Sequence, residues 1–220
     1  MITLNHVEFK YSNSGFGMRV PSLTIEAGSK AALVGPSGSG KTTLLHIIAG
    51  IRVPEQGEVE VCGVDLASSA DAARRDFRIS TIGFVFQDFE LIDYLDVNEN
   101  ILLPYLINNS LKFDSTVREA ARSLAESMGL GNKLTRRIDR LSHGERQRVA
   151  ICRALLLSPR ILLADEPTGN LDPKNKERIL RILFDCATNA NAALLVVTHD
   201  YNLLGGFDQV VDCQQFQVGD

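Results

Sequence analysis

Apolar and polar residues alternate over much of about the first sixty positions, which predicts β-strands with one buried face. The segment from Ile2 to Phe9 alternates in part, Leu23 and Ile25 alternate before a turn, and Val59 and Val61 alternate after a glycine. A period of two places every second side chain on the same side of a sheet. We therefore expect β structure at the N-terminus.

Farther along the chain, short runs of consecutive apolar residues alternate with segments of helical periodicity. The apolar runs, which we expect to be strands, are 31–34, 79–86, 161–164 and 192–198. The helical segments are 42–49, 115–128 and 174–187. Apolar strands that alternate with helices indicate an α/β fold with a parallel sheet covered on both faces. Between about 88 and 157 the pattern is mainly helical, which predicts a helical insertion.

The composition is that of an ordinary globular chain. Of its 220 residues, 45% are hydrophobic and 23% are charged, so the chain can bury a core as one domain. The net charge of -4 includes no basic excess, and we expect no nucleic-acid partner. The cysteines form no CxxC pair, which favours a reducing cytosol over a zinc or redox site.

No segment of the sequence has the length of a membrane-spanning helix. The longest apolar candidates, Ala150 to Leu157 and Ala192 to Thr198, are far shorter than the ~20 residues needed to cross a bilayer. The N-terminus has no basic segment followed by a long apolar stretch, so we expect no secretory signal. A role at a membrane would therefore require docking to a partner.

A glycine-rich loop stands between an apolar run and a helical segment. Its sequence, GPSGSGKTT, fits the phosphate-loop pattern G-x-x-x-x-G-K-[ST]. Glycines let successive N–H groups point inward, and the following helix N-terminus favours an anion. Lys41 can reach the β- and γ-phosphates of a nucleotide, and the Thr42 hydroxyl can bind Mg²⁺. The candidate nucleotide-binding residues of this loop are Gly35, Pro36, Ser37, Gly38, Ser39, Gly40, Lys41, Thr42 and Thr43.

Two carboxylates follow the apolar run ILLA in the segment ILLADEP. Such residues lie at the carboxyl edge of a parallel sheet, where ligands bind in open α/β folds. We predict that Asp165 holds Mg²⁺, directly or through water, and that Glu166 is the general base for the attacking water.

A second helix N-terminus is predicted in the segment LSHGERQR. Ser142 and Glu145 have the S-x-x-E spacing of a capping box, in which each side chain bonds to a backbone N–H of the other. A capped helix is one interpretation of the pattern. A second use is compatible with it, because a helix N-terminus with Gly144 nearby is also an anion site.

Taken together, these motifs resemble those of ABC (ATP-binding cassette) transporter nucleotide-binding subunits. LSHGERQ resembles the family signature LSGGQ, and ILLADEP resembles its Walker B segment at the usual separation. The resemblance covers essentially the whole chain. It implies an α/β P-loop NTPase core with a mainly parallel sheet, an N-terminal antiparallel β subdomain and an inserted helical subdomain. One domain then spans 1–220, with its core at about 1–87 and 158–220 and its helical subdomain at about 88–157.

Further positions resemble other functional segments of the family. Gln87 resembles the glutamine that touches Mg²⁺ and the attacking water, and His199 resembles the switch histidine that contacts the γ-phosphate. Leu171 and Asp172, in GNLD, resemble the loop that crosses between two subunits. Tyr11 resembles the aromatic residue that stacks on adenine. The resemblance thus implies Glu166, His199 and Gln87 as catalytic residues, and Thr42, Gln87 and Asp165 as metal ligands.

The family also implies a mechanism and partners. Two copies pair head to tail, so that Ser142 and Gly144 of one chain contact the Mg-ATP held by the phosphate loop of the other. Closure of this dimer on ATP drives a separate integral membrane, permease-type subunit, and the ATPase lies in the cytoplasm on the inner face of the cell membrane. Longer segments are similar to the ATPases of lipoprotein-releasing, macrolide-exporting and cell-division complexes; these segments are GFVFQDFELI, VNENILLP, LSHGERQRVAICRAL and ADEPTGNLD.

Several alternatives remain open. A soluble ABC-type ATPase without a membrane partner usually carries two cassettes or a long coiled-coil insertion, and this chain shows neither. A small-molecule kinase would share the phosphate loop but would not need LSHGERQ or His199. His143 and Glu145 depart from the signature LSGGQ, and His143 is the less typical replacement. The transported substrate, the direction of transport and the choice between homodimer and heterodimer are open, although a full set of motifs favours a homodimer.

Overall fold

Two β-sheets and a group of helices make up the chain. The computed structural model describes residues 1–12, 15–108, 111–169 and 171–218. The first sheet is antiparallel, with the order β10-β2-β1-β4-β5. Its strands are β1 (Ile2–Lys10), β2 (Gly17–Ile25), β4 (Gln56–Val61), β5 (Val64–Asp65) and β10 (Gln217–Val218). This sheet confirms the expected N-terminal β region, and β10 returns to it from the other end of the chain.

The second sheet is parallel throughout its described strands, with the order β6-β7-β8-β3-β9. The strands are β3 (Lys30–Val34), β6 (Ile82–Val85), β7 (Ile161–Asp165), β8 (Ala193–Val197) and β9 (Gln209–Asp212). Every residue of β7 and β8 is buried, as expected for central strands with helices on both faces. The α/β fold predicted from the alternating pattern is confirmed.

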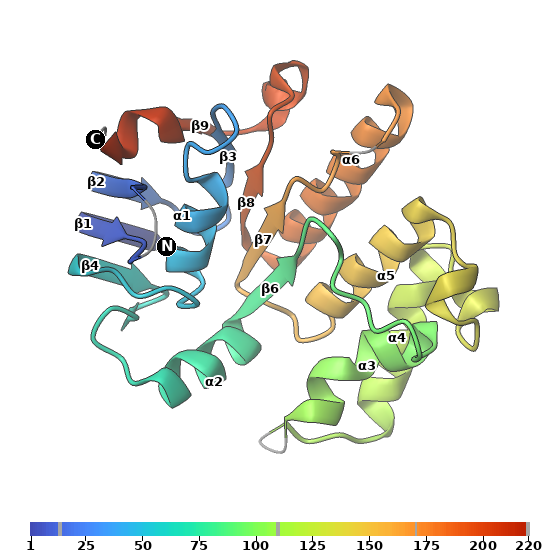
Figure 1. The fold of residues 1–220 in the computed structure, drawn as a ribbon. Helices are drawn as coiled ribbons and strands as arrows, with labels where there is room; N and C mark the ends of the chain where they lie inside the picture. Colours follow the sequence, from blue (N-terminus) through green and yellow to red (C-terminus); the bar gives the residue numbers. More distant parts are fainter. Residues whose placement is uncertain (13–14, 109–110, 170, 219–220) are drawn as a thin grey trace.

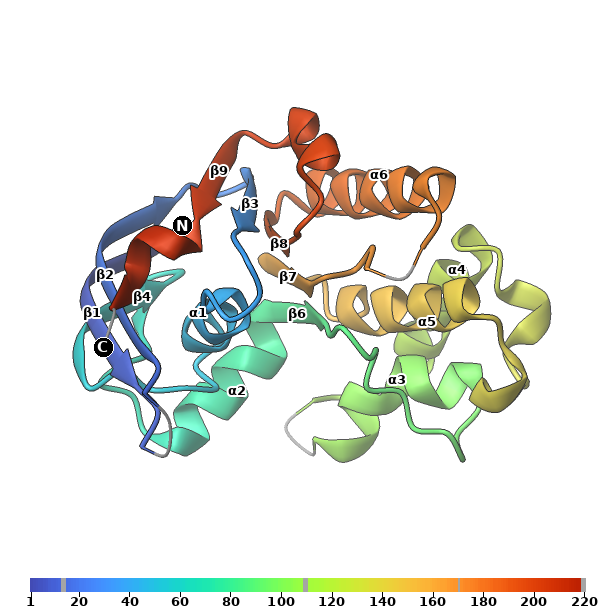
Figure 2. The same ribbon diagram turned by 45° about the horizontal axis from the view of Figure 1, so that its top comes forward.

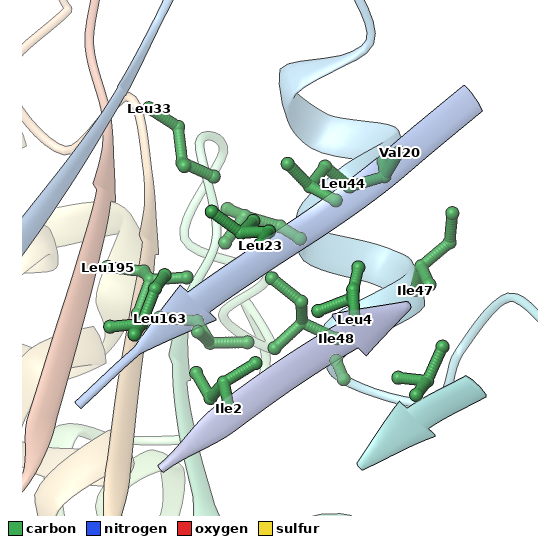
Figure 3. Packing of buried hydrophobic residues seen from close by; sticks show 14 of the residues in the cluster. Ile2, Leu4, Val20, Leu23, Leu33, Leu44, Ile47, Ile48, Leu163 and Leu195 are labelled. Carbon is green, nitrogen blue, oxygen red and sulfur yellow. The ribbon is translucent and has the colours of Figure 1, made fainter. Parts of the chain in front are cut away.

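Helix α1 (Lys41–Ile48) lies between the two sheets, as Figures 1 and 2 show. Figure 3 shows how its side chains pack: Leu44, Ile47 and Ile48 lie among residues from both sheets. Ile2 and Leu4 come from the antiparallel sheet, whereas Leu163 and Leu195 come from the parallel sheet, and all of them are fully buried. This shared core fixes the loop before α1 relative to both sheets.

The helices between β6 and β7 pack around a core of their own, which includes Ile101, Ala121 and Val149. They are α3 (Val97–Ile107), α4 (Ser115–Ser127) and α5 (His143–Leu155), with short 3-10 turns at Gly131–Lys133 and Ile138–Arg140. Both views place α3 and α4 on the side away from the antiparallel sheet (Figures 1 and 2). The inserted helical region is therefore confirmed, while its division at about 88 and 157 stays a prediction.

The predicted strand at 79–86 is wrong at its start. Residues 79–81 belong to helix α2 (Asp71–Thr81), and the strand begins only at Ile82. Ile79, Thr81 and Ile82 are β-branched and favour a strand, and the nearest glycine, Gly83, lies inside the strand itself, so the sequence carries no boundary signal between Thr81 and Ile82. Helix α2 itself was missed because it is rich in arginine and has no fully buried residue.

The remaining helical elements follow the last strands of the parallel sheet in the sequence. Helix α6 (Pro173–Ala190) lies between β7 and β8 in the sequence, and 3-10 turns occupy Tyr201–Gly206 and Cys213–Phe216. Within the described residues, no helix combines the length and the apolar character needed to cross a membrane.

Candidate functional site

The phosphate loop connects β3 to α1 and has the backbone that its glycines predict. Gly35, Gly38 and Gly40 have φ of 138°, 82° and 88°, in the region that favours glycine. A Cβ at Gly40 would lie 2.4 Å from Met18 Cε and 2.6 Å from Phe16 Cζ, so the loop also needs glycine there for space. Among the described residues, no side chain accepts a hydrogen bond from the first N–H groups of α1. These N–H groups are available to a phosphate.

The Lys41 ammonium group lies over this loop. Its side chain is buried, and Nζ donates hydrogen bonds of 2.9 Å to the carbonyl oxygens of Gly35 and Pro36. The loop therefore curls around a fixed positive charge. An anion that enters the loop meets both this ammonium group and the N-terminus of α1.

The loop opens into a cavity of about 470 Å³ whose lining includes residues from four segments of the chain. A cavity of this size falls in the range of cofactor and small-molecule sites. The lining residues are Tyr11, Phe16, Ser37, Gly38, Gly40, Lys41, Thr42, Thr43, Gln87 and Glu166. The structure thus brings together most of the residues predicted to bind nucleotide and two of those predicted to be catalytic. Phe16 was missed, because it belongs to no motif and reaches the loop only through the tertiary fold.

Tyr11 is held beside the loop by several contacts. Its hydroxyl lies 3.2 Å from Thr43 Oγ1, and the Arg52 guanidinium carbon lies 5.3 Å from its ring centroid. The Phe9 ring meets it edge-on, with centroids 4.9 Å apart. These contacts fix an aromatic ring in the lining of the cavity, and stacking of a base on it remains a prediction.

Asp165 ends β7 and is only 4% exposed. Burial raises the pKa of its carboxyl group, while a hydrogen bond from the Thr42 side chain acts to lower it. Its Oδ1 is buried and has no hydrogen-bond partner in the described structure. A buried carboxylate oxygen without a partner, next to a hydroxyl group, suits a hard cation such as Mg²⁺.

The donor set around Asp165 is small. The described residues contain no cluster of three or more His, Cys, Asp or Glu side chains that could hold a metal ion. Thr42, Asp165 and Gln87 together offer only a hydroxyl, a carboxylate and an amide oxygen. Such a set fits Mg²⁺, which usually keeps waters and phosphate oxygens in its coordination shell.

Glu166 and His199 meet at the carboxyl edge of the parallel sheet. Glu166 has a φ of 45°, which is uncommon for a residue with a side chain, and its N–H donates to Val197 O at 3.1 Å. Its Oε2 lies 3.4 Å from His199 Nδ1. Glu166 and His199 line a cavity of about 270 Å³ together, and Glu166 also lines the phosphate-loop cavity, so the histidine after β8 can orient the carboxylate.

The predicted capping box at the N-terminus of α5 is present. Ser142 Oγ accepts a 3.4 Å hydrogen bond from Glu145 N–H, and Glu145 Oε2 accepts a 2.8 Å bond from Ser142 N–H. Lys133 also bonds to Glu145 and, with the Ser142 N–H, lowers the pKa of its carboxyl group to about 2. Ser142 and Gly144 are not among the described residues that line the phosphate-loop cavity.

The GNLD segment starts helix α6. Asp172 caps this helix, since its Oδ1 accepts a 3.2 Å hydrogen bond from Asn175 N–H, and Pro173 follows at the first helical position. Leu171 packs against the core that contains β7 and β8. Asn170 lies outside the described residues. The structure thus shows a capping role for Asp172, and contacts of this segment with a second subunit remain a prediction.

The chain is similar to proteins of one family along most of its length. The ABC transporter family model matches residues 18–169. Lipoprotein-releasing system ATP-binding protein LolD 1 of Rhodopirellula baltica is 41% identical over 206 residues, which cover 92% of this chain and 89% of that protein. Macrolide export ATP-binding/permease protein MacB of the same organism is 41% identical over 190 residues, 86% of this chain but only 28% of that protein.

One solved structure extends this similarity to three dimensions. The dimeric structure of a post-hydrolysis state of the ATP-binding cassette MJ0796, bound to ADP and Pi, matches with a TM-score of 0.86 at 31% identity. The match covers 99% of this chain and 98% of that one.

Proposed function

The chain belongs to the ABC transporter family as an ATP-binding ATPase subunit, and from this premise we propose that two copies pair head to tail and drive a separate membrane subunit. The proposal also includes the predicted catalytic, nucleotide-binding and metal-binding residues, Mg²⁺ as the bound cation, and a position of the ATPase on the cytoplasmic face of the membrane. The lipoprotein-releasing and macrolide-export relatives support the same class of complex.

The groups around the phosphate-loop cavity suit ATP hydrolysis. Lys41 and the N-terminus of α1 hold the phosphates and neutralise their charge. Glu166 accepts a proton from the attacking water, and His199, 3.4 Å away, orients the carboxylate. Thr42, Asp165 and Gln87 would hold Mg²⁺, which when bound supplies positive charge to the phosphate oxygens.

The pairing is supported by how the predicted ATP-binding groups divide within one chain. The described residues of the phosphate-loop cavity include Tyr11 and Lys41 but neither Ser142 nor Gly144. Ser142 nevertheless caps α5 at an exposed helix N-terminus, which is a favourable place for phosphate. A second chain would bring its phosphate loop to this terminus. MJ0796 forms a dimer bound to ADP and Pi, which supports this arrangement.

A groove between α2 and α3 suits the membrane subunit. It has a volume of about 610 Å³ and its lining is mainly apolar. Phe84, Leu103 and Ile107 supply apolar surface, and Ile107 is 70% exposed. Arg75 and Asp76 add charged groups at the same groove. We infer that a short amphipathic segment of the membrane subunit docks here. MacB, whose name joins ATP-binding and permease functions, supports a direct physical link.

Purification of the tagged chain from native membranes in mild detergent tests this function. We expect an integral membrane protein to co-purify at a fixed ratio with the ATPase. An Ile107→Asp variant should lose that protein at least about tenfold, because a charge replaces an apolar anchor. A Val210→Asp variant is the matched control, since Val210 is 47% exposed on β9, at the opposite edge of the parallel sheet from β6.

The alternative is a soluble ABC-type ATPase. Recovery of the wild-type chain from the soluble fraction alone, with no membrane protein attached, would favour that alternative. Equal recovery of a membrane protein with both variants would instead place the docking surface elsewhere than the α2–α3 groove.

A further inference from the structure

Helix α5 contacts the segment after Gln87 at both of its ends. At its C-terminal end, Arg153 is buried and donates hydrogen bonds of 2.5 Å to the carbonyl oxygens of Phe89 and Glu90. At its N-terminal end, the ring of His143 meets the ring of Phe89 edge-on, with centroids 4.9 Å apart and planes at 64°. Side chains from both ends of the helix thus converge on Phe89 and Glu90.

This segment has an unusual backbone. Phe89 and Glu90 are consecutive residues with φ of 63° and 48°, although neither is a glycine. Such a conformation is strained and persists only where surrounding contacts hold it in place. The Arg153 hydrogen bonds hold the carbonyl groups, and the Phe89 side chain is buried in a cluster that includes Ala150 and Ile151 of α5, with the exposed His143 ring against its edge.

The two rings also lie next to the catalytic groups. Gln87, Phe89 and His143 all line two neighbouring cavities, of about 270 and 200 Å³. The larger cavity is also lined by Glu166 and His199. His143, Phe89 and Gln87 therefore adjoin the same two cavities in the same chain.

We propose that His143 is a positioning residue which, through its contact with Phe89, couples the N-terminus of α5 to Gln87. This inference rests on the proposed function, in which the α5 N-terminus binds the partner's nucleotide while Gln87 serves the chain's own. When the partner's nucleotide holds the N-terminus of α5 in place, the contact with Phe89 then holds Gln87 in place beside the chain's own nucleotide. The contact requires an aromatic ring at 143, which the glycine of the signature LSGGQ cannot supply.

Substitutions at both rings test the coupling. His143→Ala removes one ring, and we expect kcat for ATP hydrolysis to fall about fivefold, the size expected of one aromatic pair, with KM within about twofold. His143→Phe keeps the ring and should retain at least about half of kcat. The double variant His143→Ala/Phe89→Leu should be no slower than the slower single variant, because both changes break the same contact. His6→Gly is the control, since His6 is exposed and has a φ of 50°.

Amide hydrogen exchange supplies a readout that needs neither the dimer nor turnover. In the free chain, the Phe89 N–H bonds to Phe86 O at 3.0 Å. His143→Ala should speed exchange at Phe89 severalfold, while His143→Phe should not. A wild-type chain that hydrolysed no ATP would contradict the proposed function, and the exchange rates would still test the contact.

Three results would overturn the coupling. One is a kcat for His143→Phe as low as that of His143→Ala, since the imidazole nitrogens rather than the ring would then matter. Another is an unchanged kcat and exchange rate in His143→Ala. The third is a double variant whose loss equals the product of the two single losses.

Discussion

Glu166 combines a strained backbone with a place in the lining of the phosphate-loop cavity, and we propose it as the general base. Glu166→Gln keeps the shape of the side chain but cannot accept a proton. We expect kcat to fall at least about 100-fold, with ATP affinity within about threefold of wild type. Steady-state kinetics and equilibrium ATP binding measure the two effects. Glu177→Gln, at an exposed position on α6, is the control, and an unaltered turnover rate in Glu166→Gln would exclude Glu166 as the general base.

Asp165 is predicted to lower the stability of the metal-free fold while it contributes to Mg²⁺ binding. Its buried carboxylate has one oxygen without a partner, which is unfavourable for the fold when no cation is bound. Asp165→Asn should therefore leave the free energy of unfolding equal or higher in the absence of Mg²⁺. The Mg²⁺ concentration for half-maximal ATPase activity should rise at least about tenfold. Urea unfolding with EDTA and a magnesium titration check the two parts, and an unchanged magnesium requirement would argue against Asp165 as a ligand.

Single residues could be predicted from the sequence where a motif requires one residue type at a fixed position. Gly40 and Lys41 stand in a fixed spacing, and the structure places both in the phosphate loop. Phe16 and Arg153 could not be predicted, because their contacts join segments far apart in the chain. Phe16, just before β2, lies against Gly40 of the phosphate loop. Arg153 of α5 donates hydrogen bonds to two backbone carbonyl groups before α3.

Among the elements, α5 depends on the charge of Glu145. The pKa of this carboxyl group is about 2 in the folded chain against 4.5 ordinarily, because Lys133 and the Ser142 N–H favour the charged form. A lowered pKa stabilises the fold fully above about pH 4.5, and this contribution is lost as the pH falls toward 2. Glu145→Gln should lower the free energy of unfolding by about 1 kcal/mol at pH 7.

The difference between wild type and Glu145→Gln should shrink as the pH falls from 4.5 to 3. Urea unfolding followed by circular dichroism at pH 7, 5, 4 and 3 measures it. Glu119→Gln, exposed on α4, should match wild type at every pH. A difference that stayed constant down to pH 3 would show that the charge of Glu145 contributes nothing.

Elements with a strong apolar pattern were predicted well, and elements without one were not. The strand at 161–164 and the helix at 115–128 were found because β7 is wholly buried and α4 is amphipathic. Helix α2 has no fully buried residue, and β9 is a short strand whose place beside β3 depends on the parallel sheet. The place of β9 follows from tertiary packing, which local periodicity does not record, whereas α2 is amphipathic but so polar overall that its few apolar residues give a weak signal.

The fold places the two helix N-termini that we predict to bind phosphate in different parts of the molecule. Helix α1 lies between the two sheets and follows the phosphate loop, whereas α5 belongs to the helical region, and Ser142 and Gly144 at its N-terminus are not among the described residues that line that loop's cavity. His143, between these two residues, lines a smaller cavity together with Glu166 and His199, so a second chain is needed only for the proposed contact of Ser142 and Gly144 with a phosphate loop. The order of the motifs predicted the phosphate loop and the N-terminus of α5, but the distance between the two depends on the fold.

The central claim, that ATP is enclosed between two copies of the chain, is tested most directly by the mass of Glu166→Gln in solution. Light scattering should give twice the monomer mass with Mg-ATP and the monomer mass with ADP. Adding Ser142→Arg should leave ATP bound but prevent the dimer, because the arginine fills the site of the partner's phosphate. A monomer with Mg-ATP, or a dimer that Ser142→Arg leaves intact, would contradict the account.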